Sequence, residues 1–585
     1  MGQPWWQGAV GYEIYVRSFL DDDGDGLGDL AGVRAKLPYL ADLGVDIVWL
    51  TPFYPSPQAD HGYDVADYLD VDPRFGTLDV LLALTTEAHE LGLRLVIDLV
   101  PNHTSDHHPW FVDSRASRDA EYRDFYVWRD PAPDGGPPNN WVSHFGGPAW
   151  TFDETTGQYY MHLFLPEQPD LNWAEPRVCA AFEDILDTWF SRGIDGVRID
   201  VAHSLVEDPE FRDNPLLGEG IEQAEDDDPS PDPTTARLVF DRFVHVHDVD
   251  QPGVVDIYRD WNVVAAKHDA LLLGEVYILD PIKLHRYVTD DALHAAFCFD
   301  TLKLAWDADE VRDTLRPYVE VSGDALAWPL SSHDDPHAAT RFGGGARGAR
   351  RALAYFTFLC GLPGAPFLYQ GDELGLEDGH LETGVASDPI AVRNPGTIGR
   401  DAVRTPMPWE PGPGFGFTTG EPWLPFGSNR TDETTVAAQL GFPGSHLERT
   451  RELLATRRRL SALTNGSPTE WITDEGPVVV IERGEEVLVA LHVGDGDGPA
   501  ELVLPEGCRL AFATMAEVEL IGDTLYLPED SAAIIELEPT EDGEEPMLDA
   551  EERALMDRAA ADQDLARMSG DDTGIGHDGA GGANG

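Results

Sequence analysis

The chain has 585 residues, 42% of them hydrophobic, so it is long enough for several domains with well-filled cores. Its 107 acidic and 40 basic residues give a formal net charge of −67. Repulsion between like charges excludes nucleic acid and anionic membrane surfaces as natural partners. The acidic surface is either simply solvated or adapted to high salt.

Cysteine and lysine are both scarce. The cysteines are far apart and form neither a CxxC pair nor a metal-ligand cluster, so free thiols in a reducing compartment are expected for Cys179, Cys298, Cys360 and Cys508. Lysine occurs only at positions 36, 267, 283 and 303. The first residues, MGQPWWQGAV, lack the basic and apolar regions of a secretory signal, and no apolar run reaches the length of a membrane span. We therefore expect a cytoplasmic enzyme.

Short apolar runs recur along the chain, and several are followed by stretches with helical periodicity, such as residues 27–44 and 78–93. Strands that alternate with helices indicate a parallel sheet, and eight of them predict a (β/α)8 TIM barrel of the α/β class. In such a barrel the chemistry gathers at the C-terminal ends of the strands. The eight runs are residues 11–17, 45–50, 94–99, 194–200, 270–276, 294–300, 325–332 and 364–370.

Two regions interrupt this rhythm. Residues 103–172 are rich in Trp, Phe, Gly, Pro and Asp and predict an insertion after the third strand, and residues 204–262 form another long connection with the acidic run EDDDPSPDP. After about residue 470 apolar and polar residues alternate, which predicts a small antiparallel β domain. The expected division is barrel 1–102 and 173–465, insertion 103–172, β domain 466–540, and an acidic, largely disordered tail 541–585.

Four motifs with acids or histidines fall at the ends of predicted strands: DLVPNHTS (98–105), GVRIDVAHS (196–204), LLGEVY (272–277) and SSHDDP (331–336). Buried acids cost free energy unless they are paired, so carboxylates from several strands that converge on one barrel mouth indicate an active site rather than packing. Paired carboxylates are what glycoside hydrolysis requires.

The residues around two of these acids suit different roles. Arg198 lies two residues before Asp200, so both side chains share one face of a strand, where the cation favours an ionised nucleophile. Glu275 has apolar neighbours, and burial raises the pKa of a carboxyl so that it keeps a proton for the leaving group.

In this order the four motifs resemble the conserved regions of the α-amylase family of glycoside hydrolases (family 13), and the resemblance extends over residues 5–540. It implies a retaining mechanism. In the terms of that family, the insertion corresponds to domain B, and the terminal β domain corresponds to domain C. It implies that Asp200 is the nucleophile, Glu275 the general acid/base and Asp334 the transition-state stabiliser. It places His103, Arg198 and His333 around the sugar that is cleaved.

Further segments narrow the resemblance to the exo-acting α-glucosidase and oligo-1,6-glucosidase branch. They are TPFYPSPQADHGYDVADY (51–68), QPDLNW (168–173), GAPFLYQGDELGL (364–376) and RDAVRTPMPW (400–409). The branch implies small α-glucoside substrates, no organic cofactor, and additional substrate-binding residues at Asp60, Tyr63, Phe145, Phe164 and Arg400. Ordinary packing inside domain B is an equal alternative for the two phenylalanines.

The stretch DDDGDGLGD (21–29) begins like an EF-hand loop, but Gly32 stands where the last glutamate ligand belongs. It resembles the loop after strand one that holds a structural calcium ion in the oligo-1,6-glucosidase branch. That resemblance implies Ca2+ ligands at Asp21, Asp23, Asp25, Leu27 (by its carbonyl) and Asp29. The alternative is an acidic turn without an ion, although its carboxylates repel one another unless they are neutralised.

Some residues depart from the family's pattern. Ser332 stands where the family commonly has Asn, and His337 stands where it commonly has Arg. The change at His337 is expected to remove a cation near the entrance of the site. Asp335 replaces an apolar residue. Val201, next to Asp200, is more typical of α-1,6 than of α-1,4 cleavage.

We therefore expect an exo-acting, retaining α-glucosidase on maltose- or isomaltose-type sugars. The alternatives are a transglycosylating or isomerising relative such as a trehalose synthase or a sucrose-active enzyme, an α-amylase, or a catalytically silent scaffold. The linkage preference and the oligomeric state stay open.

Overall fold

A computed structural model describes residues 3–217, 240–289, 291–382, 384–394, 399–494, 496 and 498–538. The predicted acidic tail, residues 541–585, and the acidic run EDDDPSPDP lie outside the described residues. All four cysteines are free thiols, two of them buried. In the described part of the chain, none of the helices is both long and apolar enough to cross a membrane.

Eight parallel strands form a closed barrel, in the order β1-β11-β10-β9-β8-β7-β3-β2. Each strand lies within one of the eight predicted apolar runs, so the predicted (β/α)8 barrel is confirmed. The strands are β1 (Gly11–Ile14), β2 (Ile47–Leu50), β3 (Arg94–Leu99), β7 (Gly196–Ile199), β8 (Leu271–Gly274), β9 (Ala295–Phe297), β10 (Leu326–Pro329) and β11 (Ala365–Tyr369).

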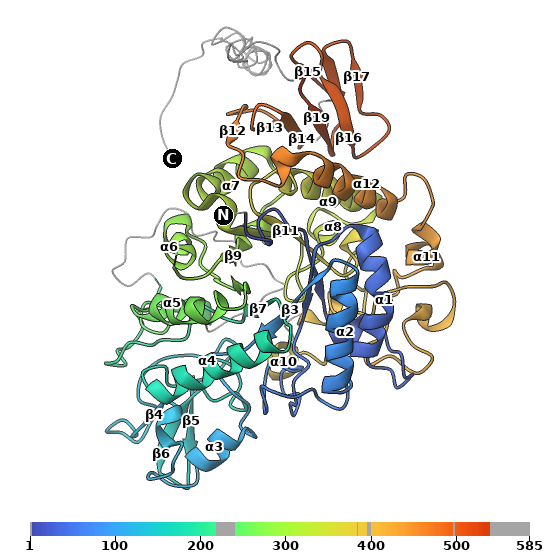
Figure 1. The fold of residues 1–585 in the computed structure, drawn as a ribbon. Helices are drawn as coiled ribbons and strands as arrows, with labels where there is room; N and C mark the ends of the chain where they lie inside the picture. The colour runs from blue at the N-terminus through green and yellow to red at the C-terminus, as the bar shows by residue number, and fades with distance from the viewer. Residues whose placement is uncertain are drawn as a thin grey trace, which may run out of the picture.

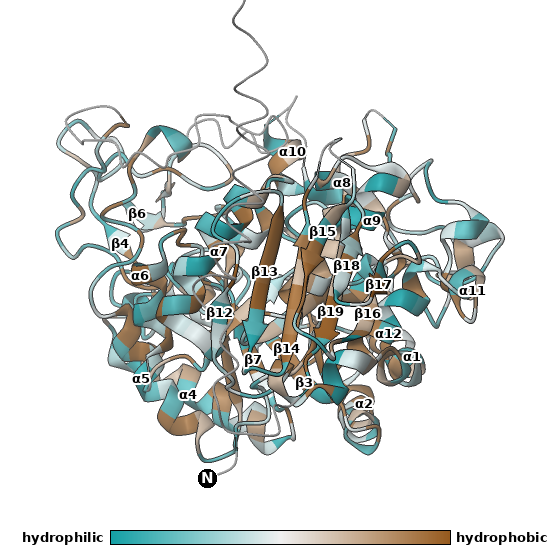
Figure 2. Ribbon diagram, turned by 90° about the horizontal axis from the view of Figure 1, so that it is seen from above, coloured by the Kyte–Doolittle hydropathy of each residue, from teal (hydrophilic) through white to brown (hydrophobic). Residues whose placement is uncertain are grey.

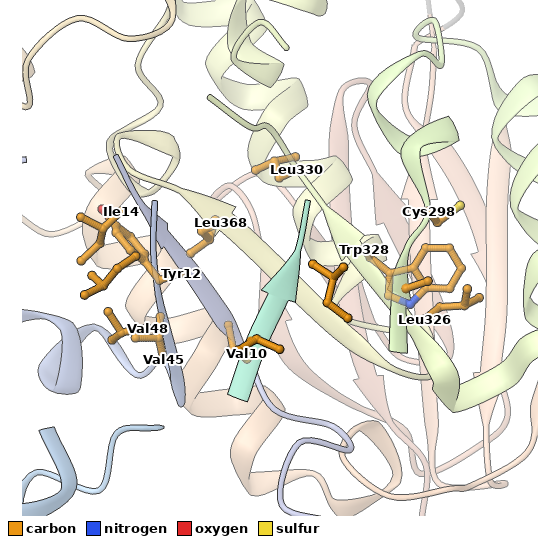
Figure 3. Close-up of a cluster of buried hydrophobic side chains, with 14 of the residues drawn as sticks. Val10, Tyr12, Ile14, Val45, Val48, Cys298, Leu326, Trp328, Leu330 and Leu368 are labelled. Carbon is orange, nitrogen blue, oxygen red and sulfur yellow. The ribbon is translucent and has the colours of Figure 1, made fainter. Parts of the chain in front are cut away.

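In six of the eight barrel strands, alternate residues belong to two different apolar cores. On β2, Ile47 and Trp49 pack in the barrel interior, whereas Val48 and Leu50 pack outward against the helices. Figure 3 shows part of the outer core, with Tyr12, Ile14 and Val48 among its labelled side chains. Both faces of the strands are therefore buried, which explains why they appear in the sequence as continuous apolar runs.

Helices surround the barrel, and α1 and α2 lie side by side on its outer face (Figure 1). Side-chain oxygens cap several helix N-termini, including Asp29 before α1 and Ser445 before α12. The helices are α1 (Leu30–Leu43), α2 (Leu78–Glu90), α4 (Pro176–Ser191), α5 (Val254–Ala265), α6 (Pro281–His285), α7 (Ala308–Ser322), α8 (Ala338–Arg341), α9 (Gly345–Leu359), α10 (Pro389–Arg393), α11 (Val436–Gln439) and α12 (His446–Arg459).

Domain B interrupts the barrel between β3 and β7, as predicted. Helix α3 (Pro109–Ser114) opens it, and an antiparallel sheet follows in the order β4-β6-β5. Its strands are β4 (Trp128–Arg129), β5 (Trp150–Asp153) and β6 (Gln158–Met161). Figure 1 shows these elements together beyond α4, at one side of the barrel.

Domain C consists of two antiparallel sheets, β12-β13-β14-β19-β16 and β15-β18-β17. The larger sheet packs on α9, α7 and α12 (Figure 1), and its central strands are strongly hydrophobic (Figure 2). The predicted antiparallel β domain is therefore confirmed, while the exact domain boundaries stay predictions. The strands are β12 (Thr469–Trp471), β13 (Val478–Arg483), β14 (Val487–His492), β15 (Ala500–Val503), β16 (Arg509–Ala513), β17 (Glu519–Ile521), β18 (Thr524–Leu527) and β19 (Ser531–Glu536).

Candidate active site

Strand periodicity aims the polar residues at the C-terminal mouth of the barrel. On β8 the side chains of Leu271 and Leu273 point inward, and Glu275 and Tyr277 continue the same alternation beyond the strand end. Arg198 and Asp200 follow Gly196 on β7 in the same way. The inward-facing groups line a cavity of about 260 Å³, together with Asp334 and its neighbours. The predicted convergence of motifs from separate strands is therefore present in the structure.

Arg198 lies at the centre of the first charge cluster. Its Nη1 is 2.7 Å from Asp98 Oδ1 and 2.7 Å from Asp200 Oδ1, and its Nη2 is 2.7 Å from Glu275 Oε2. All four residues come from the ends of three adjacent strands, β3, β7 and β8. One guanidinium thus joins the predicted nucleophile and the predicted acid/base and fixes their separation.

One cation serves three carboxyls in this cluster, which favours the protonated form of a carboxyl. Burial raises the pKa of Asp200 and of Glu275, and the attraction of Arg198 only partly lowers it again. Burial also raises the pKa of Asp98 to about 6. Arg198 alone was expected to keep Asp200 ionised, but burial outweighs it. The carboxyls of Asp200 and Glu275 both contact the same guanidinium, so the protonation of one affects the pKa of the other.

Val201 contributes its backbone to this cluster. Its N–H donates to Glu275 Oε2 at 2.8 Å, and its φ is +45°. A β-branched residue in this left-handed region costs about 1–3 kcal/mol, a cost that is typical of functional sites. The strained turn directly after Asp200 therefore points a backbone donor at the predicted acid/base.

Asp334 belongs to a second cluster, in which several basic side chains contact this one carboxyl. Arg400 Nη1 lies 3.1 Å from Asp334 Oδ1, Arg404 Nη2 donates to the same oxygen, and His333 Nε2 is 3.3 Å away. Burial alone would raise the pKa of Asp334, but His333, Arg400 and Arg404 together hold it well below its usual range. Asp334 is therefore ionised at neutral pH and faces the cavity.

His333 is oriented by a residue that the sequence did not single out. Its Nδ1 is bonded to the carboxyl of Glu13 on β1, and its Nε2 is 2.9 Å from the hydroxyl of Tyr63. The Tyr63 hydroxyl also donates to Asp98 Oδ2 at 3.1 Å. Glu13, Tyr63 and His333 therefore connect the two charge clusters. Burial lowers the pKa of His333 to about 3, so its ring is neutral near pH 7.

Asp60 and His103 close one end of the cavity with Gln168, which lies in the QPDLNW segment. The amide of Gln168 is 3.2 Å from Asp60 Oδ2 and 2.9 Å from His103 Nε2. Arg400 Nη2 reaches Asp60 Oδ1 at 3.3 Å. Burial raises the pKa of Asp60 to about 6 and lowers that of His103 to about 3.

Phe145 and Phe164 complete this closed end. Their rings pack edge to face at 5.7 Å, and the guanidinium of Arg400 lies 5.4 Å from the ring centre of Phe145. Asn394 Nδ2 donates to the carbonyl oxygen of Phe145 at 3.0 Å, which ties domain B to the segment that carries Arg400. Both phenylalanines line the cavity, and Phe145 is also buried. Phe145 therefore both packs inside domain B and forms part of the cavity wall.

The departures from the family pattern have specific surroundings. The hydroxyl of Ser332 accepts hydrogen bonds from the backbone N–H groups of Asp334 and Asp335, at 3.2 and 3.1 Å. His337 was expected near the entrance, but it is buried and its Nδ1 is 3.0 Å from Asp372 Oδ1. Substitution at this position therefore changes a buried contact rather than the charge of the mouth.

Three acids of the predicted calcium loop, Asp21, Asp23 and Asp29, offer oxygens within 4.8 Å of one another. Carboxylate oxygens are the ligands that Ca2+ prefers, so these residues fit the ion. Asp25 is outside that group, and its Oδ1 instead accepts the N–H of Leu27 at 2.8 Å. The structure thus assembles part of the predicted ligand set, away from the cavity lining.

Comparison with known proteins agrees with this architecture. A family model described as the alpha amylase catalytic domain matches residues 13–466. The chain therefore belongs to the α-amylase family of glycoside hydrolases.

Individual relatives place it within that family. It is 39% identical over 511 residues to a probable alpha-glucosidase of Rhizobium meliloti (strain 1021), with 85% of this chain and 91% of the relative covered. It is 36% identical to an oligo-1,6-glucosidase of Heyndrickxia coagulans, with 84% and 92% covered. A trehalose-6-phosphate hydrolase of Escherichia coli (strain K12) is 36% identical, with 82% and 88% covered. Among solved structures, the alpha-glucosyl transfer enzyme XgtA has a TM-score of 0.84 at 36% identity, with 92% of this chain and 100% of that chain covered.

Proposed function

We propose that this chain is an exo-acting, retaining α-glucosidase that hydrolyses the terminal α-glucosidic bond of short α-glucosides. The observation that carries the proposal is the placement of Asp200, Glu275 and Asp334 around one cavity that Arg400 and the domain B residues Phe145 and Phe164 also line. We propose that the latter residues close one end of the cavity, so that it admits only a terminal sugar. This closure disfavours an α-amylase, which cleaves inside long chains.

The guanidinium that Asp200 and Glu275 share supports the retaining stereochemistry. Inverting glycosidases keep their two carboxyls about 6.5–9.5 Å apart to hold a water, whereas retaining enzymes keep them about 5–5.5 Å apart. Here one guanidinium binds both carboxyls at 2.7 Å, which holds them close together, as retaining enzymes require.

In the proposed mechanism Asp200 attacks C1 of the terminal glucose while the proton of Glu275 passes to the leaving oxygen, and the glycosidic C1–O bond breaks. Water then attacks C1 of the glucosyl–Asp200 ester, gives its proton to Glu275 and releases glucose. Asp334, held ionised by Arg400 and Arg404, accepts hydrogen bonds from the sugar hydroxyls and stabilises the positive charge that develops on the ring.

We further propose that Asp21, Asp23 and Asp29 hold a structural Ca2+ ion, with Asp25 and the Leu27 carbonyl as additional ligands. The ion would neutralise an acidic loop at the N-terminus of α1, where Asp29 also caps the helix. A cytoplasmic location stays a prediction.

The test is glucose release by the purified protein from maltose, isomaltose, sucrose, trehalose and soluble starch, at low and high salt. We expect rapid release from one or more of the small sugars and little from starch. A new disaccharide with little free glucose would instead establish a transferase or isomerase, an activity suggested by the similarity to XgtA.

Variants test the assigned roles. Asp200→Asn and Glu275→Gln should each lower kcat at least a thousandfold. Asp195→Asn is the matched control, because Asp195 precedes β7 at the opposite end of the barrel and bonds His89 and Arg94. It should retain most of the activity. Unchanged turnover in Asp200→Asn would refute the catalytic assignment.

A further inference from the structure

A lysine and an aspartate form an ion pair in the wall of the cavity. Lys303 Nζ lies 2.6 Å from Asp335 Oδ1, which joins the loop after β9 to the loop after β10. Both residues line the cavity; the Asp335 side chain is only 10% exposed, whereas that of Lys303 is 39% exposed. Lysine occurs at only four positions in this chain.

This ion pair lies on the leaving-group side of the site. The general acid must contact the oxygen of the departing sugar, so that sugar lies beside Glu275 and away from Asp60 and Arg400. Tyr277 is the next residue with the orientation of Glu275 and therefore lies further along the same wall. The Lys303 ammonium is 5.5 Å from the ring centre of Tyr277.

The charges of Lys303 and Asp335 cancel, but Lys303 still has an N–H group that can donate a hydrogen bond to a ligand. An ammonium has three N–H donors, of which one meets Asp335 and another faces Tyr277, so one is left for a ligand. Burial lowers the pKa of Lys303, but the attraction of Asp335 and Tyr277 raises it further, so the group stays charged. Two arginines that line the cavity are likewise matched by carboxylates: Arg198 by Asp200 and Arg400 by Asp388.

We propose that Lys303 and Asp335 form the leaving-group subsite and restrict it to uncharged sugars. Lys303 donates to a hydroxyl of the departing sugar, and Asp335 neutralises the cation that would otherwise attract a phosphorylated or carboxylated one. This proposal rests on the proposed α-glucosidase activity and adds to it the class of leaving group. Without Asp335, the same lysine would favour an anionic leaving group, because an unpaired cation in a partly buried wall attracts anions strongly.

The test uses two aryl α-glucosides that differ in the charge of the leaving group, p-nitrophenyl and p-carboxyphenyl α-glucoside. The quantity measured is the ratio of kcat/KM for the carboxylated to the nitrated substrate. Because both share the same glucose, defects at the closed end cancel in this ratio. Asp335→Asn should raise the ratio about tenfold or more over that of the unmodified protein. The double variant Lys303→Met/Asp335→Asn should return it to within about threefold.

Asp378→Asn is the matched control, because Asp378 also lines the cavity but accepts the backbone N–H of His337 instead of pairing with Lys303. It should change the ratio by less than about threefold. An unchanged ratio in Asp335→Asn, a double variant as high as Asp335→Asn, or an equal rise in Asp378→Asn would each overturn the proposal. If the unmodified protein released no p-nitrophenol, the proposed function itself would fall, and this result is distinct from the other three.

Discussion

Replacing Arg198 with lysine tests the central arrangement of the site. Arg198 makes three contacts of 2.7 Å, to Asp98, Asp200 and Glu275. The lysine side chain of Arg198→Lys ends in a single ammonium group, which can keep about one of these three contacts. Each charge-assisted hydrogen bond contributes about 1.5–3 kcal/mol, so the loss of two costs about 3–6 kcal/mol. If this cost falls on the transition state, kcat/KM drops about a hundredfold to ten-thousandfold.

The pH dependence adds a second readout for Arg198→Lys. With the cation less well placed, the pKa values of Asp200 and Glu275 rise further. The acid limb of the kcat/KM profile, which follows ionisation of Asp200, and the basic limb, which follows loss of the Glu275 proton, should both move to higher pH. Arg457→Lys is the control, because Arg457 is buried beyond the other end of the barrel and donates to the carbonyls of Cys360 and Gly364. It should lower the melting temperature without changing kcat/KM. Activity of Arg198→Lys within tenfold of the unmodified protein would refute the reasoning.

Three further predictions follow from particular groups. The acid limb of kcat/KM should not lie below about pH 6, because burial raises the pKa of both Asp60 and Asp98 to about 6 and the ionised forms accept the hydrogen bonds of the site; a limb below pH 4.5 would contradict this. A calcium chelator should lower the melting temperature of the unmodified protein by several degrees but leave that of Asp21→Asn unchanged, and equal shifts in both would argue against the proposed ion. Val201→Ala should shift the ratio of kcat/KM for maltose over isomaltose towards maltose, and an unaltered ratio would show that this side chain does not select the linkage.

The barrel could be predicted from the sequence because its strands are buried on both faces. Runs such as RLVIDL admit few alternatives, and the acids that follow them fall at one end of a parallel barrel by construction. Arg198 and Asp200 share an orientation because they are two residues apart on a strand, and the structure bears out that local geometry. Inferences of this kind depend only on short-range periodicity.

The contacts that the sequence did not indicate join distant segments. Glu13 meets His333 across 320 residues, and Gln168 meets Asp60 across 108. Arg404 lies in the same RDAVRTPMPW segment as Arg400, four residues later, and the second arginine there was the available signal. No periodicity specifies which loops meet at the mouth of a barrel, so these partners emerge only from tertiary packing.

The two charge clusters divide the chemistry between them. Around Arg198 three carboxyls share one cation, which favours the protonated form of Glu275, the form that can donate a proton. Around Asp334 two arginines hold one carboxyl ionised, so it stays an acceptor when Asp200 changes charge. Acid catalysis depends on the difference between the raised pKa of Glu275 and the lowered pKa of Asp334, and this difference comes from the different charges around the two carboxyls.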